Sequence, residues 1–198
     1  HLKTTDNVLF DKEETEVIYY LNTKENTVYS LPSTIKTIRP GAFYSNQYLQ
    51  FIDLSEGLKE ISSNAFSSCL SLETLTIPTT LETIGSNAFC WCENLTSIII
   101  PDSVTAIGDY AFYSCTGLTS ITLPDSLTRI EHYAFSTCTN LTTITIPESV
   151  TSIGEAAFTN CSSLQEFNGK FASDDGKCLV VDGVLNSFAI GSGVTEYT

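Results

Sequence analysis

Methionine is absent from this chain of 198 residues, and basic side chains are scarce, with nine lysines and arginines against 23 aspartates and glutamates. Without a starting methionine, we expect a signal segment to have been removed ahead of His1. The formal net charge is −14, and Arg129 is the only lysine or arginine between Lys59 and Lys170. That stretch repels phosphate groups, which argues against nucleic acid and anionic lipid as partners.

Long apolar runs and catalytic motifs are also missing. No apolar run approaches the roughly 20 residues that a membrane-spanning helix needs, so we expect no direct membrane insertion. The sequence has two histidines, and it holds no Ser–His–Asp set, no zinc-binding histidine pair and no glycine-rich phosphate loop. We therefore predict that the chain is not an enzyme and has no catalytic residues, no metal ligands and no cofactor.

The sequence does contain a repeat with a period of 23 residues. The dipeptide Ala-Phe begins at residues 42, 65, 88, 111, 134 and 157. Leucine recurs at 49, 72, 95, 118, 141 and 164, and isoleucine recurs at 38, 61, 84, 107, 130 and 153. Proline fills 32, 78, 101, 124 and 147, and cysteine fills 69, 92, 115, 138 and 161. A period of 20–29 residues with Leu-x-x-Leu-x-Leu spacing is typical of a leucine-rich repeat solenoid.

The spacing within one repeat predicts the shape of a rung. In residues 72–78 the side chains of Leu75 and Ile77 alternate inward, as in a strand, and Pro78 ends the strand because it lacks an N–H group. A second extended piece is expected over residues 81–84. We expect residues 88–92 to return the chain across the far side in a tight helical turn. One rung buries too little to offset its conformational entropy, so rungs must stack.

The full repeat carries a family resemblance. The pattern L-x-x-I-x-I-P-x-x-V-x-x-I-G-x-x-A-F-x-x-C over residues 26–168 resembles the BspA-like (Treponema-pallidum-type) leucine-rich repeat family. The resemblance implies bacterial or protozoan surface proteins, often described as adhesins. The expected fold is an α+β solenoid, a right-handed leucine-rich repeat superhelix of 23-residue repeats with irregular ends that contain β-hairpins.

The period stops at both ends, where turn signals appear. Asp-Asn at 6–7 and Asp-Gly at 182–183 predict hairpins that pair 8–10 with 17–20 and 178–181 with 184–188. We divide the chain into an N-terminal hairpin, cap or irregular rung (1–25), six repeats (26–168), and a C-terminal hairpin with the start of a further rung (169–198). The ends are either irregular rungs of a longer solenoid or caps that shield the core.

The chain has seven cysteines. The five in the repeat column are predicted to be buried and reduced, because parallel side chains on successive rungs give poor disulfide geometry. The slot before the column holds Asn46, so we expect these thiols to bond backbone groups of the turn, as an asparagine would. Cys90 and Cys178 lie off the column and are the thiols in which reactivity is expected.

Two surfaces are candidate binding sites. The outward strand positions of the expected concave face are Phe51, Asp53, Thr74, Thr76, Ser97, Ile99, Ser120, Thr122, Thr143 and Thr145. An aromatic patch is formed by Trp91, Tyr110, Tyr113 and Tyr133. Threonine also suits any exposed strand, and the rings could simply cover tight turns. Asp102 and Asp125 follow prolines, where Asp-Ser is typical of turns.

These features predict a non-catalytic binding module that is secreted or displayed on the cell surface and is monomeric. The family resemblance implies that its ligand is a host extracellular protein, a mucin or another glycan, and solenoids offer extended surfaces for such binding. The alternative is a structural spacer array that carries another functional domain in a longer protein.

Overall fold

The strands of the repeats fall into two sets. The computed structural model describes residues 2–22, 26–181, 184–189 and 191. The first strand of each rung is β4 (Val28–Ser30), β6 (Phe51–Asp53), β8 (Thr74–Thr76), β10 (Ser97–Ile99), β12 (Ser120–Thr122), β14 (Thr143–Ile146) or β16 (Glu166–Gly169). The second strand is β5 (Thr37–Ile38), β7 (Glu60–Ile61), β9 (Thr83–Ile84), β11 (Ala106–Ile107), β13 (Arg129–Ile130) or β15 (Ser152–Ile153).

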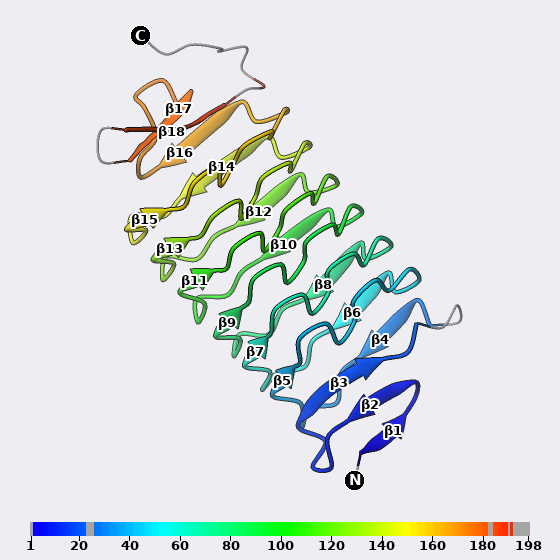
Figure 1. Ribbon diagram of the computed structural model, residues 1–198. Helices are drawn as coiled ribbons and strands as arrows, with labels where there is room; N and C mark the ends of the chain where they lie inside the picture. The colour runs from blue at the N-terminus through cyan, green and yellow to red at the C-terminus, as the bar shows by residue number, and fades with distance from the viewer. Residues whose placement is uncertain (1, 23–25, 182–183, 190, 192–198) are drawn as a thin grey trace.

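The rungs stack in a nearly straight column (Figure 1). Parallel pairing joins each strand to the strand one repeat on, as Ile38 pairs with Ile61 and Ile107 with Ile130. The second strands lie in one continuous sheet, whereas the first strands form three separate sheets, β4-β6-β8, β10-β12 and β14-β16. The predicted leucine-rich repeat solenoid is confirmed.

The third side of each rung is a run of turns, and the helical turn expected there is wrong: the described residues contain no α-helix. Asn87 and Trp91 have positive φ angles of 57° and 62°, and the equivalent residues of the other rungs share this left-handed conformation. The N–H groups of Asn87, Phe89 and Trp91 each donate to the next rung at 2.8 Å. The N–H groups between them bond back within their own rung, so a helix cannot form.

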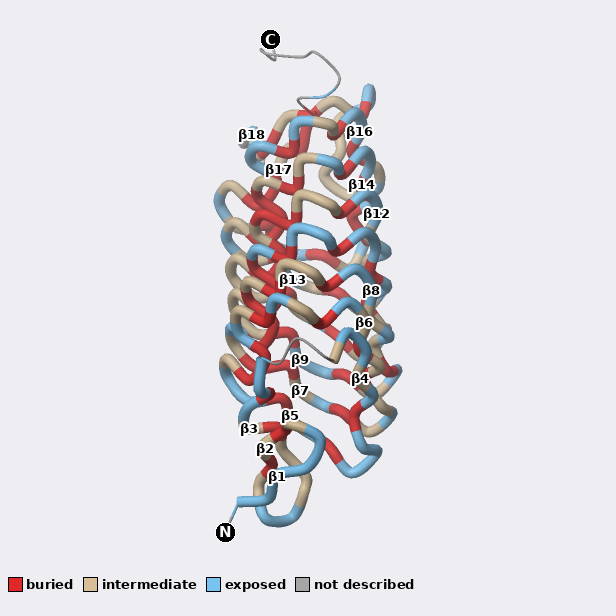
Figure 2. Tube along the Cα trace, turned by 90° about the vertical axis from the view of Figure 1, so that its right-hand side faces the viewer, coloured by how far each residue is buried: buried red, intermediate tan, exposed pale blue. Residues whose placement is uncertain are grey.

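A column of aromatic rings runs through the core, among the buried leucine, isoleucine and cysteine side chains of the rungs. Phe66, Phe89, Phe112, Phe135 and Phe158 are almost fully buried and stack with centroid separations of 5.3–5.4 Å. Figure 2 shows the buried backbone running through the length of the stack. Each ring therefore fills the space between its two neighbours, which explains why Ala-Phe recurs with the period.

Hairpins lie at both ends, as predicted. The N-terminal strands β1 (Lys3–Thr5), β2 (Val8–Phe10) and β3 (Glu16–Tyr20) pair antiparallel, and β3 continues in parallel into β5. The strand β1 was not predicted, although Asp6 and Asn7, with φ angles of 48° and 63°, form the turn that joins β1 to β2. The C-terminal strands β17 (Cys178–Val181) and β18 (Val184–Phe188) also pair antiparallel.

The aromatic column ends under these hairpins. Tyr20 stacks on Phe43 at the N-terminal end with a centroid separation of 4.8 Å, and Phe167 meets Phe158 edge-on at the other. The turn at 182–183 and the strand expected over 194–198 lie outside the described residues. The division of the chain into 1–25, 26–168 and 169–198 stays a prediction. None of the described residues forms a helix long and apolar enough to cross a lipid bilayer.

The packing predicts a large difference between two aromatic substitutions. Phe112→Ala opens a void between two stacked rings and should lower the free energy of unfolding by about 3–5 kcal/mol. Trp91→Ser restores the residue found at this position in other rungs and removes a side chain that is 45% exposed. We expect it to change stability by no more than about 0.5 kcal/mol in urea denaturation. An equal loss in both variants would make Trp91 a core residue.

Candidate functional site

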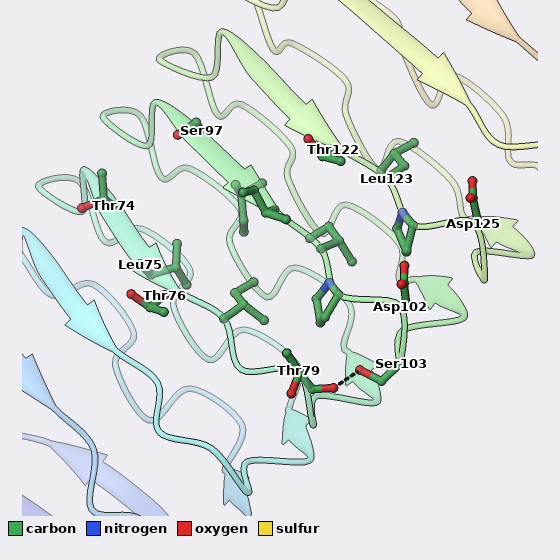
Figure 3. Close-up of a pocket in the computed structure, with 16 residues that line it drawn as sticks. Thr74, Leu75, Thr76, Thr79, Ser97, Asp102, Ser103, Thr122, Leu123 and Asp125 are labelled. Carbon is green, nitrogen blue, oxygen red and sulfur yellow. Dashed lines mark hydrogen bonds between the residues drawn. The ribbon is translucent and has the colours of Figure 1, made fainter.

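A hollow of about 870 Å³ lies over β8, β10 and β12. Figure 3 shows the threonines of β8 and the start of β10 along one side and the Thr79, Asp102 and Asp125 turns along the other. The Ser103 hydroxyl donates to the Thr79 carbonyl at 2.8 Å and ties two successive turns together. The hollow thus has an apolar floor and a rim of hydroxyls and carboxylates.

The hollow lies over an opening between rungs. The strands β8 and β10 belong to different sheets, so the parallel ladder stops between them. Leu75 and Ile77 of the β8 rung are only half-buried, as are Ile121 and Leu123 of the β12 rung, whereas the equivalent Ile98 and Ile100 between them are 3% and 2% exposed. Core side chains of the β8 and β12 rungs are therefore exposed to a ligand from the first-strand face.

Ile99 is the side chain that most departs from the rest of this face. It is 73% exposed, although the equivalent positions on β8 and β12 hold the polar Thr76 and Thr122. An exposed isoleucine beside half-buried leucine and isoleucine enlarges the apolar surface of the hollow. Contiguous apolar surface rimmed by polar groups is typical of binding sites.

Half of the predicted strand residues come together here. Thr74, Thr76, Ser97, Ile99 and Thr122 line the hollow. The remaining candidates lie on first strands outside it, and they are Phe51, Asp53, Ser120, Thr143 and Thr145. Asp102 and Asp125, which the sequence analysis assigned to turns, form its acidic rim.

The four predicted aromatic residues form one continuous surface on the turns, which we call the aromatic ledge (Trp91, Tyr110, Tyr113 and Tyr133). Trp91 meets Tyr113 edge-on at a centroid separation of 5.6 Å, and Tyr113 meets Tyr110 at 5.6 Å. Tyr110 stacks on Tyr133 of the next rung at 4.9 Å. The rings therefore reach across three successive rungs.

Three residues of the ledge have unusual backbone conformations. The φ angles of Trp91, Tyr110 and Tyr133 are 62°, 55° and 55°. A residue with a Cβ atom in this left-handed region costs roughly 1–2 kcal/mol relative to its usual conformation. In other rungs the Tyr110 position holds Gly41 or Asn64, which tolerate that conformation better.

Neither surface carries a cluster of metal-ligating side chains in the part of the chain that the structure describes. The described residues contain no group of three or more histidine, cysteine, aspartate or glutamate side chains that could hold a metal ion. His132 is tied into the turns, because its Nδ1 accepts from the Glu155 backbone N–H at 3.0 Å and its backbone N–H donates to the Asp109 carboxylate at 3.1 Å. The geometry of the two surfaces therefore suits binding.

Comparison with known proteins places this geometry in a family. A family model described as the BspA type leucine rich repeat region matches in six copies, over residues 18–104 and 82–174. The chain belongs to the BspA-type leucine-rich repeat family. The resemblance carried by the repeat pattern is therefore confirmed, and a search of curated proteins gives no match.

Several solved structures are similar to this BspA-type chain. A leucine-rich repeat protein from Bacteroides ovatus has a TM-score of 0.73 and 29% identity, over 88% of this chain and 47% of its own length. A leucine rich cell surface protein from Faecalibacterium prausnitzii has a TM-score of 0.64 and 28% identity, over 93% and 57%. The T. pallidum leucine rich repeat protein has a TM-score of 0.65 and 27% identity, over 83% and 87%.

The chain spans about half the length of the first two of these proteins. The likeness therefore extends to the repeat scaffold, and it covers only part of the Bacteroides and Faecalibacterium proteins.

The cysteine column of the BspA-type repeat is buried and reduced in the structure, as predicted. All seven cysteines are free and buried. Each column thiol donates to the carbonyl of a phenylalanine in the preceding rung, as Cys92 does to Phe66 at 3.2 Å and Cys115 does to Phe89 at 3.1 Å. The reactivity expected of Cys90 and Cys178 is wrong, because both are buried and burial raises the pKa of Cys90 to about 11.

Thiol accessibility offers a direct test of this column. We expect labelling by a thiol reagent to be slow in the native protein and fast in denaturant, because the thiolate, which reacts, is suppressed by burial. Reductant should leave the melting temperature unchanged. A fall of several degrees on adding reductant would reveal a structural disulfide and contradict the hydrogen-bonded arrangement.

The same burial predicts a loss of stability at high pH. Burial raises the pKa of Cys69 from 9.0 to about 12, so the folded chain keeps a proton that the unfolded chain releases. The resulting stabilisation is complete below pH 9 and is lost as the pH rises towards 12. Cys69→Ser keeps a hydrogen-bond donor but does not titrate. The unfolding free energy of the parent should therefore fall more steeply than that of the variant, by up to about 1.4 kcal/mol per pH unit. Equal slopes in urea denaturation would contradict the assignment.

Proposed function

We propose that the chain is a non-catalytic binding module displayed on or secreted from a bacterial cell, and that it attaches to a host extracellular protein, a mucin or another glycan. The observation that carries the proposal is the hollow over β8, β10 and β12, with Ile99 standing 73% exposed at its centre. Folding does not require an exposed apolar side chain at this position. A ligand-binding surface does use such a group when hydroxyls surround it.

The chemistry of the hollow favours binding over catalysis. Its titratable residues are Asp102 and Asp125, which lie on separate exposed turns along the rim. General acid–base or nucleophilic catalysis needs such groups to be held together at a reacting atom. The apolar floor instead supplies contact area, and the threonine hydroxyls and carboxylates supply hydrogen-bond acceptors and donors that orient a ligand.

Cell-surface display is supported by two observations. One similar structure is that of a leucine rich cell surface protein, and the repeat pattern is that of a family described as surface proteins. A net charge of −14 also keeps an extended, exposed molecule soluble.

A spacer that carries another domain is the second candidate function. It is favoured by the regular stack and by the fact that the chain covers only 47% of the Bacteroides ovatus protein. The two functions differ in what they require of the hollow, because a spacer needs no ligand there.

Binding measurements with a pair of matched variants test the proposal. The protein would be screened by biolayer interferometry against immobilised matrix proteins, mucins and glycans. For a ligand that binds, Ile99→Asp should weaken affinity by roughly tenfold or more, because it places a charge in the apolar centre of the contact. Thr83→Asp is the control, since it adds the same charge at an exposed position of β9 on the second-strand face.

The control variant should bind as the parent does. Consistent failure of the parent to bind any matrix protein, mucin or glycan would reject attachment and favour the spacer. Equal affinity of Ile99→Asp and the parent would move the binding site away from the hollow.

A further inference from the structure

The aromatic ledge is not required by the core. Trp91 is 45% exposed and Tyr110, Tyr113 and Tyr133 are partly exposed, whereas the core of the same rungs is filled by Phe89, Phe112 and Phe135. Other rungs carry serine or asparagine at the Trp91 position and fold in the same way. The rings therefore add to the surface of the solenoid without completing its interior.

The backbone argues in the same direction. The Tyr110 and Tyr133 positions are left-handed, and the sequence fills them elsewhere with Gly41, Asn64 and Asn87. Bulky side chains are disfavoured in this conformation. Strain alone does not single out the tyrosines, since Ala156 holds the same conformation. What singles them out is that the strained positions of adjacent rungs carry rings that touch one another and Trp91 through Tyr113.

The charges around the ledge are negative. Asp109 precedes Tyr110 in sequence, and the exposed Glu93 follows Trp91 by two residues. The exposed Glu155 belongs to the next rung, where its carbonyl accepts the Tyr133 N–H at 3.0 Å. The pKa of Tyr110 is raised, mainly because its hydroxyl is partly desolvated. The electrostatic effects of Tyr133, Asp109 and Glu155 raise it further.

Arg129, the one lysine or arginine on the rungs that carry the ledge, already forms an ion pair. Arg129 lies 3.4 Å from the carboxylate of Glu131. His132 accepts a backbone hydrogen bond at Nδ1 and lies between Asp109 and Glu155 in the stack. The ring faces of the ledge are thus bordered by carboxylates that still have acceptor capacity.

We propose that the aromatic ledge is a second binding surface, and that it takes an arginine-bearing segment of a partner protein. A guanidinium group is planar and stacks on Trp and Tyr faces, and its N–H fork donates to carboxylates such as Asp109 and Glu155. The net charge of −14 disfavours sialylated or sulfated glycans at the same place. This surface is separate from the hollow, so the proposal stands even where the hollow binds nothing.

Trp91 allows the proposal to be tested directly, because it is the only tryptophan in the chain and lies on the ledge. The full chain would be titrated with a short peptide of alternating arginine and glycine while tryptophan emission is followed. We expect a saturable change that weakens severalfold between about 50 and about 300 mM NaCl, because the contact is partly ionic. A peptide of alternating glutamate and glycine should give no saturable change.

Substitutions that suit the backbone locate the contact. The double variant Tyr110→Asn with Tyr133→Asn keeps Trp91 as the reporter and installs the residue of Asn64 and Asn87, so it should fold. It should weaken peptide binding by roughly tenfold. Tyr44→Ser is the matched control: it removes an exposed tyrosine from the Tyr113 position of a rung that does not touch the ledge. Circular dichroism and the melting temperature would verify that both variants fold.

Further variants test whether the arginine peptide binds at the ledge. Asp109→Asn combined with Glu155→Gln should weaken binding and flatten its salt dependence, and Ile99→Asp should leave it unchanged. Equal affinity in the double tyrosine variant would overturn the proposal, as would loss of binding in Ile99→Asp, which would place the peptide in the hollow. Saturable binding of neutral chitotriose without binding of the arginine peptide would make the ledge a glycan site instead.

Discussion

The stack depends on one hydrogen bond that is repeated from rung to rung. From Phe43 to Phe135, the N–H of each phenylalanine of the aromatic column donates to the carbonyl of the alanine one rung further on, as in Phe89 to Ala111 and Phe112 to Ala134, at 2.8 Å. The carbonyl of the same phenylalanine accepts the backbone N–H of a cysteine in its own rung and the thiol of a cysteine in the next, as Phe89 does from Cys92 and Cys115. Alanine, phenylalanine and cysteine are thus parts of one bonding unit, and a change of period in any rung would break it.

Features that recur in each rung could be predicted from the sequence, because six copies reveal a position that one copy would hide. The solenoid, the buried phenylalanines and the thiol column follow from this. The pairing of β2 with β3 was predicted from their apolar residues, but the Asp6-Asn7 turn signal belongs to the β1–β2 hairpin, which was missed. The turn side was predicted wrongly because the apolar spacing of Ala88, Phe89 and Cys92 fits a helix as well as a chain of turns. The distinguishing signal was Gly41, Asn64 and Asn87, residues that tolerate a positive φ angle.

The hollow could not be predicted in the same way. It lies where the hydrogen-bond ladder stops between β8 and β10. Whether two strands pair depends on how two complete rungs pack, and no single position of the repeat determines that packing. In the sequence, Ile99 is one of several residues, with Phe51 and Asp53, that interrupt the serine and threonine array of this strand face. The sequence did not indicate that Leu75 and Ile77 would be half-exposed beside Ile99, or that Asp102 and Asp125 would form a rim.

The free thiols determine which environments suit the fold. A stack held by disulfides would need an oxidant during maturation and would risk wrong pairings among the five equivalent cysteines of the column. Here each column sulfur acts as a hydrogen-bond donor, and all seven are buried away from reagents. Assembly can therefore proceed rung by rung without any redox partner. The finished molecule would keep the same shape in reducing and in oxidising surroundings.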